Sequence, residues 1–179
     1  MECLMPARET LIPVLLEKVY QLIQDKVDSK HQVVVTKLAQ HLFSNISNDD
    51  LISRNESDLY GAVISLWQYL KEKSIDDVSV RVFNPSLTQH GWQSTHTIVE
   101  IILNDIPFLV DSIKMAWSRM GLTSHLMLHG PAKLHLDESG KLYDINNDAL
   151  EGTLESVFHI EVDRLSSKKQ MDELQSELM

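Results

Sequence analysis

Cysteine, long apolar runs and basic side chains are all scarce in this chain. Cys3 is the single cysteine among 179 residues, which excludes an internal disulfide and favours a reducing, cytoplasmic location. No apolar run approaches the roughly 18 residues that a membrane span needs. The first residues, MECLMPARET, lack the basic and then apolar layout of a secretory signal. We therefore expect a cytoplasmic protein without a membrane partner.

The charge of the chain is acidic and unevenly distributed. The net charge is −10, with 8 basic and 10 acidic side chains in residues 1–74 but 8 and 16 in residues 75–179. Such a field repels phosphate backbones, and no stripe of Lys and Arg with interleaved aromatic residues compensates for it. The sequence therefore predicts no nucleic-acid partner.

Motifs of catalysis and cofactor binding are absent as well. The chain contains no G-x-G-x-x-G, P-loop, G-x-S-x-G or H-E-x-x-H sequence. Cys3 lies near the N-terminus, where chains often fray, which makes it a poor nucleophile. We expect no catalytic residue and no cofactor-binding residue in this chain.

The histidines form one pattern that a metal site could use. His125, Met127 and His129 alternate along a predicted strand and so share one face, with His135 nearby. With further ligands from a partner strand, they could bind zinc or copper. The alternative is that they line the solvent face of a sheet, because no cysteine or carboxylate stands at ligand spacing. We predict no metal site and keep a metal-binding module as a rival interpretation.

Residues 1–74 are predicted to form a helical subdomain. Apolar residues spaced as on one helix face indicate a first helix from about Ile12 to Val27 and a second over residues 32–44. Asn55 followed three positions later by Asp58 is typical of a capping box and predicts the start of a third helix.

Residues 75–179 are predicted to form mostly strands. Alternation around Val80 indicates a half-buried strand, and residues 97–103 are apolar on both faces except for Glu100, which is typical of a central strand. A helix that begins at Pro107 and ends near Gly121 carries an apolar stripe, which we expect to pack on one face of the sheet. An alternating ribbon follows, with a bulge or kink predicted at Gly130.

The predicted order is three helices and then β, β, α, β, β, β, α. A ferredoxin-like unit (βαββαβ) ends with one more strand after its second helix. The sequence therefore predicts an α+β fold. A helical subdomain, 1–74, precedes an incomplete ferredoxin-like antiparallel sheet, 75–179, with helices on one face and truncated before its last strand. The unpaired edge of such a sheet favours association with a second copy of the chain.

The turn between the central strand and the Pro107 helix is the main candidate for binding. Asp105 could cap this helix, and Asp111 lies in its first turns, where negative charge suits the helix dipole. In the alternative interpretation, N–H groups at this helix start receive the carboxylate of a ligand.

Four phrases of the sequence together resemble a known family. They are DDLISRNESDLYGAVISLW (Asp49–Trp67), VRVFNP (Val80–Pro85), HGWQSTHTIVEIILNDIPFLVDSI (His90–Ile113) and RMGLTSHLMLHG (Arg119–Gly130). From about Leu38 onward the chain resembles the N-terminal region of the large bacterial NAD-specific glutamate dehydrogenases, which is described as containing ACT-like domains. The resemblance implies that the chain is a piece of a longer enzyme, whose NAD-binding and catalytic residues have no counterpart here.

The resemblance also carries over part of an ACT-type ligand site. In typical ACT domains an acidic turn is followed by Pro-Gly-Leu, and the glycine lets a ligand approach the backbone. Here Phe108 stands in place of that glycine, and its side chain would obstruct the approach, which favours packing or assembly. The candidate ligand-binding residues are Asn104, Asp105, Phe108 and Asp111.

The expected function is therefore regulation or assembly of a large NAD-dependent glutamate dehydrogenase, which converts glutamate to 2-oxoglutarate and ammonium. The expected partners are a second copy of the chain, the catalytic region and an amino-acid effector, and NAD is the cofactor of the full-length enzyme only. The alternative is a free-standing ACT-like module that senses an amino acid.

Overall fold

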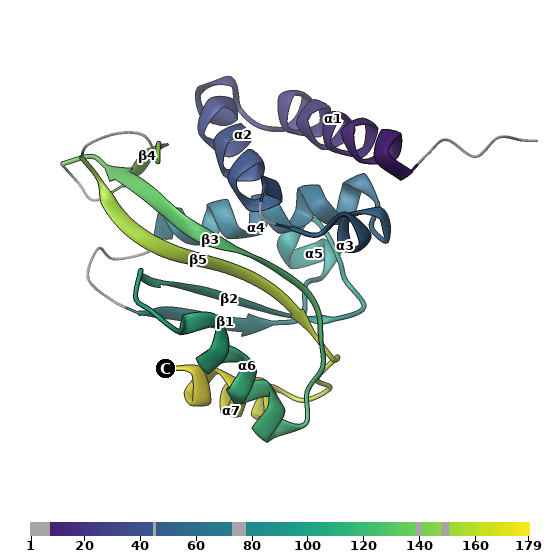
Figure 1. Cartoon of the computed structure of the whole chain (residues 1–179), viewed down its shortest axis with the longest axis vertical. Coiled ribbons are helices and arrows are strands. Elements are labelled where there is room, and N and C mark those ends of the chain that lie inside the picture. The colour runs from purple at the N-terminus through teal and green to yellow at the C-terminus, as the bar shows by residue number, and fades with distance from the viewer. Residues whose placement is uncertain (1–7, 45, 73–77, 139–140, 148–150) are drawn as a thin grey trace, which may run out of the picture.

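The chain folds into three layers, with one antiparallel sheet between two layers of helices (Figure 1). The computed structural model describes residues 8–44, 46–72, 78–138, 141–147 and 151–179. Cys3 and the predicted boundary between residues 74 and 75 lie outside these ranges.

The elements follow the predicted order closely. The helices are α1 (Arg8–Lys26), α2 (Ser29–Ser44), α3 (Asn48–Ile52), α4 (Glu56–Glu72), α5 (Leu87–His90), α6 (Leu109–Met120) and α7 (Lys168–Leu178). The strands are β1 (Ser79–Phe83), β2 (Thr97–Asn104), β3 (Ser124–Leu136), β4 (Leu142–Ile145) and β5 (Thr153–Val162). The short helices α3 and α5 were not predicted, because neither is long enough to show a helical period in its sequence.

The predicted start of the third helix is confirmed at α4. The side-chain oxygen of Asn55 accepts a hydrogen bond from the backbone N–H of Asp58 at 2.9 Å, and its amide donates to the Asp58 carboxylate at 2.7 Å. This capping satisfies N–H groups that have no partner within the helix.

The strand order is β1-β2-β5-β3-β4, and all neighbouring strands are antiparallel. The prediction that residues 97–103 form an interior strand is confirmed, because β2 lies between β1 and β5. In a ferredoxin-like unit that begins at β2, the last strand would pair with β2 at the sheet edge. Here β1, which precedes the unit in the chain, takes this position over its whole length. The edge of β2 that was expected to lack a partner is therefore paired, and the edge strands of the sheet are β1 and β4.

Helices α6 and α7 lie on one face of the sheet (Figure 1). The apolar stripe of α6 packs as predicted, with Trp117 at 3% exposure and Ile113 at 6%. From the sheet, Val99, Phe158 and Ile160 belong to the same core, and Leu174 of α7 is buried there. Burial of each large side chain stabilises the fold by roughly 1.5–3 kcal/mol.

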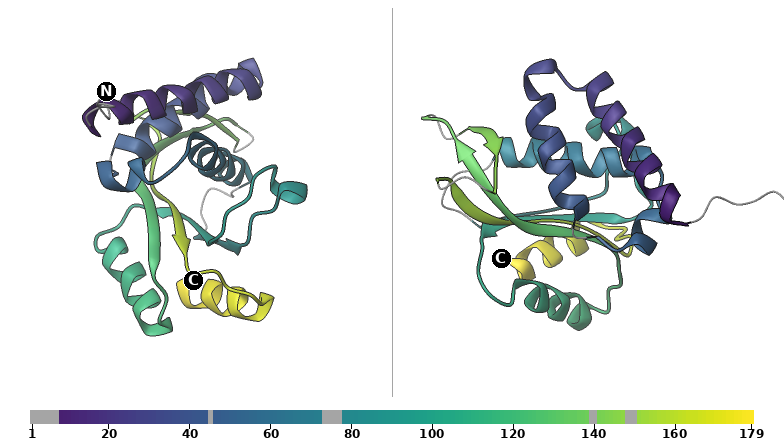
Figure 2. Two further views of the ribbon diagram at one scale, coloured as in Figure 1. Left: turned by 90° about the vertical axis from the view of Figure 1, so that its right-hand side faces the viewer. Right: turned by 45° about the horizontal axis from the view of Figure 1, so that its top comes forward.

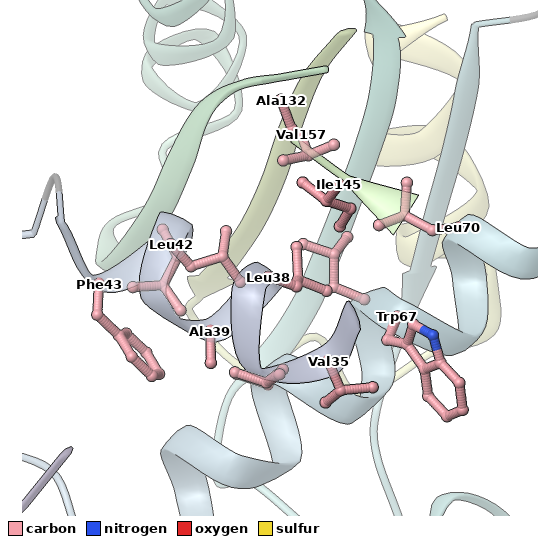
Figure 3. Close-up of a cluster of buried hydrophobic side chains, with 14 of the residues drawn as sticks. Val35, Leu38, Ala39, Leu42, Phe43, Trp67, Leu70, Ala132, Ile145 and Val157 are labelled. Atoms are coloured by element: carbon pink, nitrogen blue, oxygen red, sulfur yellow. The ribbon is translucent and has the colours of Figure 1, made fainter. Parts of the chain in front are cut away.

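The N-terminal helices cover the opposite face, as the two views of Figure 2 show. Their buried side chains form one core with Ala132, Ile145 and Val157 from the sheet (Figure 3). Leu38 of α2 and Leu70 of α4 point into this core. The helical region therefore packs directly on the sheet and shares a core with it.

Strand β3 runs without interruption through Gly130 and Pro131, so the predicted bulge at this point is wrong. Strand β4 pairs only with residues 134–136 of β3, which leaves Pro131 at an edge of the sheet. Proline is tolerated at a sheet edge, because no neighbouring strand on that side needs a hydrogen bond from its missing N–H. The register instead shifts between Ser124 and Leu126, at His125.

Candidate functional site: the turn between β2 and α6

The four candidate ligand-binding residues gather at one exposed turn. Asn104 ends β2, Asp105 follows it, and Phe108 and Asp111 begin α6. All four side chains are exposed. The structure therefore brings these residues together as the sequence implied.

Phe108 has the left-handed backbone conformation that glycine adopts without strain. Its φ is +67°, and it is the one non-glycine residue with a positive φ among the described residues. An aromatic residue at this angle is rare and costs of the order of 1–3 kcal/mol. The side chain is 79% exposed, so no described part of the chain compensates for this cost by packing on it. The glycine-like backbone of an ACT turn is thus kept, while a large apolar side chain projects from it.

Asp105 does not cap α6. The hydroxyl of Ser156 donates a hydrogen bond to the Asp105 carboxylate, and the Asp105 N–H donates to the carbonyl of Leu154 at 3.3 Å. The N-cap position belongs to Phe108, whose side chain makes no capping bond. Asp105 therefore ties the turn to β5, and only Asp111 lies where the helix dipole favours a negative charge.

A buried ion network, which the sequence analysis did not find, links the sheet to α4. Glu100 and His159 are both fully buried, and the ring Nδ1 of His159 lies 2.9 Å from a carboxylate oxygen of Glu100. The guanidinium of Arg81 donates to the other oxygen at 2.6 Å and to the Ser65 carbonyl of α4 at 2.8 Å. The only signal in the sequence was Glu100 as a charged residue within an apolar strand.

The pKa of Glu100 reflects its partners. Burial raises this pKa, but the hydrogen bond and charge of His159, together with the charge of Arg81, outweigh burial and hold the pKa below its ordinary value. Glu100 is therefore ionised in the fold. Because Arg81 also contacts α4, the network connects β1, β2 and β5 with the helical layer and acts as a structural link.

The histidines of β3 do not share one face. The register shift places the ring of His125 against that of His96, with centroids 4.4 Å apart, and 2.7 Å from the Asp163 carboxylate. His129 stacks on Phe158 in the α6 and α7 core, and His135 lies near Tyr143 at the other end of the strand. Within the described ranges, no three His, Cys, Asp or Glu side chains are placed to hold a metal ion. His125 and His129 therefore do not form the shared face that the rival metal-binding interpretation assumed.

Comparison with known proteins identifies the family. The family model described as "Glutamate dehydrogenase, ACT1 domain" matches residues 38–178. The chain is 32% identical to the NAD-specific glutamate dehydrogenase of Halomonas elongata over 92% of this chain and 10% of that protein. It is 36% identical to the protein of the same name from Pseudomonas aeruginosa over 86% of this chain and 11% of that protein.

The chain thus spans about a tenth of the length of these relatives. No solved structure matches it significantly. Among the described residues, no helix combines the length and apolar character that crossing a membrane requires. Since the family model covers most of the chain, including both faces of the sheet, this protein belongs to the family of glutamate dehydrogenase ACT1 domains.

Proposed function

We propose that this chain is a regulatory or assembly segment of a large cytoplasmic NAD-dependent glutamate dehydrogenase. The observation that carries the proposal is the match to the ACT1 domain family, combined with the tenth of its relatives' length that the chain spans. Both relatives are named NAD-specific glutamate dehydrogenases, so the complete enzyme would oxidise glutamate to 2-oxoglutarate and ammonium with NAD. The catalytic residues would lie in the part of the enzyme outside this chain.

The turn between β2 and α6 is our candidate contact for this role. It presents Phe108 and the neighbouring Ile106, which are 79% and 54% exposed. Exposed apolar side chains of this size gain free energy when a partner covers them. Asn104, Asp105 and Asp111 surround them with polar groups, as at the rim of an interface. The partner would be a second copy of the chain or the catalytic region, and an amino-acid effector would act by changing this contact.

The proposal is tested first by activity. The isolated chain should not reduce NAD in the presence of glutamate and should not bind NAD in calorimetry, whereas an enzyme that contains this chain and the catalytic region should do both. Saturable binding of NAD to the isolated chain at micromolar concentration would contradict the proposal.

Assembly is tested by Phe108→Ser in the enzyme that contains this chain. Sedimentation should show that the variant associates more weakly, or that amino acids change its association differently, because the apolar side chain of Phe108 is lost. The control is Val33→Ser, which removes another exposed apolar side chain from the outer surface of α2. If the two variants sediment alike and respond alike, the turn is not the contact. The free-standing amino-acid sensor would be favoured instead if this chain controlled enzyme activity fully as a separate polypeptide.

A further inference from the structure

A second, polar cavity lies at the other end of the sheet. It has a volume of about 810 Å³, which is within the range of roughly 300–1,000 Å³ for small-molecule pockets. Thr97 pairs with Val162 at this end of the β2–β5 ladder, while Asn104 pairs with Glu155 at the other. Seven residue steps separate the two ends, roughly 23 Å. The cavity is therefore distinct from the β2–α6 turn.

Three segments far apart in the sequence line this cavity. They are the start of α4 with the residues before it, the loop from residue 85 to residue 96, and the end of β5 with the residues that follow it. The charged and aromatic lining residues are Arg54, Asp58, Trp92, His96, Glu161 and Arg164.

A buried carboxylate lies at the base of the cavity. Glu161 is 3% exposed, and one of its carboxylate oxygens lies 2.5 Å from Arg54 Nη1 and 3.1 Å from His96 Nδ1. The other guanidinium nitrogen of Arg54 donates to the carbonyl of His125 at 3.0 Å. These contacts hold the carboxylate in place, because Arg54 is itself bound to β3.

Asp58 is a second acidic residue in the lining of the cavity. Asp58, in the first turn of α4, has a raised pKa because of burial and of the Glu161 charge, which together outweigh the effects of Arg54 and Asn55. The charge of Arg54 thus acts on both acids, through its contact with Glu161 and through its effect on the Asp58 pKa. A further cation in the cavity would be attracted by both.

Arg164, on another wall of the cavity, is the cation available to an anionic group of a ligand. Arg164 donates from Nη1 to the carbonyls of Ser94 at 2.7 Å and of His96 at 3.4 Å. Both acceptors are neutral, so these bonds orient the guanidinium without compensating its charge. A guanidinium held in this way is well suited to receive a carboxylate.

Trp92 supplies an apolar wall whose position depends on a glycine. A Cβ added to Gly61 of α4 would lie 2.8 Å from the Trp92 ring, so only glycine lets the ring pack this close to the helix. The ring centroid lies 6.1 Å from that of the buried His159. The indole is thereby wedged between the helical layer and the sheet, with its remaining surface in the cavity.

We propose that this cavity binds a small zwitterion with the charge pattern of an α-amino acid. Its ammonium group lies near Asp58 and Glu161, its carboxylate contacts Arg164, and its side chain lies along Trp92. Two arginines and two acids balance the charge of the lining, which favours a neutral zwitterion over a dianion or a dication. The biological purpose of this binding rests on the proposed regulatory function. The binding itself does not, because it needs no catalytic region.

The test uses the chain of residues 1–179 and the twenty L-amino acids, each added singly at millimolar concentration. At least one should raise the melting temperature, since a ligand that binds only the folded state stabilises it. Calorimetry with that amino acid should then give a dissociation constant that increases roughly tenfold or more in Asp58→Asn and in Arg164→Gln, through loss of a charge-assisted contact. The corresponding 2-keto acid, which lacks the ammonium group, should bind far more weakly.

Matched controls are Asp172→Asn on α7 and Arg119→Gln on α6, which make the same changes outside the cavity. Both should bind like the original chain. The proposal is wrong if no amino acid raises the melting temperature, if binding survives unchanged in both cavity variants, or if the 2-keto acid binds equally well. Loss of binding in Phe108→Ser alone would place the site at the β2–α6 turn instead. None of these outcomes depends on NAD reduction, so they leave the test of the proposed function separate.

Discussion

The two faces of the sheet are built from the same strands but bury different chemistry. On β5, Phe158, Ile160 and Val162 point to the face covered by α6 and α7, and all belong to an apolar core. The intervening His159 and Glu161 point to the face covered by the N-terminal helices, where they are buried with charged partners. The face of α6 and α7 thus needs only shape and apolar area, whereas the helical face also needs particular partners.

This difference explains where charged residues are tolerated. A buried carboxylate is stable only when cations and hydrogen bonds replace the water it has lost. Glu100 obtains them from Arg81 and His159, and Glu161 obtains them from Arg54 and His96. The apolar face can be disrupted by removing volume, and the helical face by removing one charge of a pair.

The largest effect is expected from loss of volume on the apolar face. Phe158→Ala should lower the free energy of unfolding by roughly 4 kcal/mol, because a side chain at 1% exposure leaves a cavity in a packed core. Urea unfolding followed by circular dichroism measures the change. A loss under about 1 kcal/mol would mean that this face repacks easily and that the contrast between the faces is weaker than described.

A slightly smaller effect is expected from loss of charge on the helical face. Arg81→Met should lower the free energy of unfolding by about 3 kcal/mol, because Glu100 then remains buried with His159 as its partner. The matched control is Arg119→Met, which breaks a pair with Glu177 whose side chains are 61% and 41% exposed. That change should cost less than about 1 kcal/mol. Equal losses in both variants would contradict the structural role of the buried network.

The smallest effect is expected in the pH dependence of stability. Burial, assisted by the charge of Lys114, lowers the pKa of His129 on the apolar face. A lowered pKa means that stability is complete above the unfolded value, about 6.5, and is lost as the pH falls. Glu100 also has a lowered pKa, so its contribution is complete above about pH 4.3 and is lost only below it.

The contribution of His129 should therefore be lost in a different pH window from that of Glu100. In His129→Gln, the free energy of unfolding should fall less steeply than in the original chain between about pH 7 and about pH 5. Some slope should remain, because burial also lowers the pKa of His41 and of His96. Below about pH 4.3 the two proteins should lose stability alike through Glu100. An unchanged slope in the variant would show that His129 is not kept neutral by the fold.

Local patterns in the sequence determined most of the elements and the family. Period-two alternation marked β1, and apolar residues at helical spacing marked α2, α4 and α6. The turn from Asn104 to Asp111 was also found, because its acidic and proline residues are adjacent in the chain. Such features depend on neighbours within a few positions, so a single sequence contains them.

Tertiary structure alone decided how these elements meet. The position of β1 beside β2 could not be read from chain order, because a strand from before the unit takes the place expected of one after it. The partner of Glu100 lies 59 positions away at His159, and the polar cavity combines Arg54 with Glu161 across 107 positions. Periodicity assigns a side chain to a face but does not say what covers that face. Pairings across such distances are set by packing of whole layers, which no local pattern encodes.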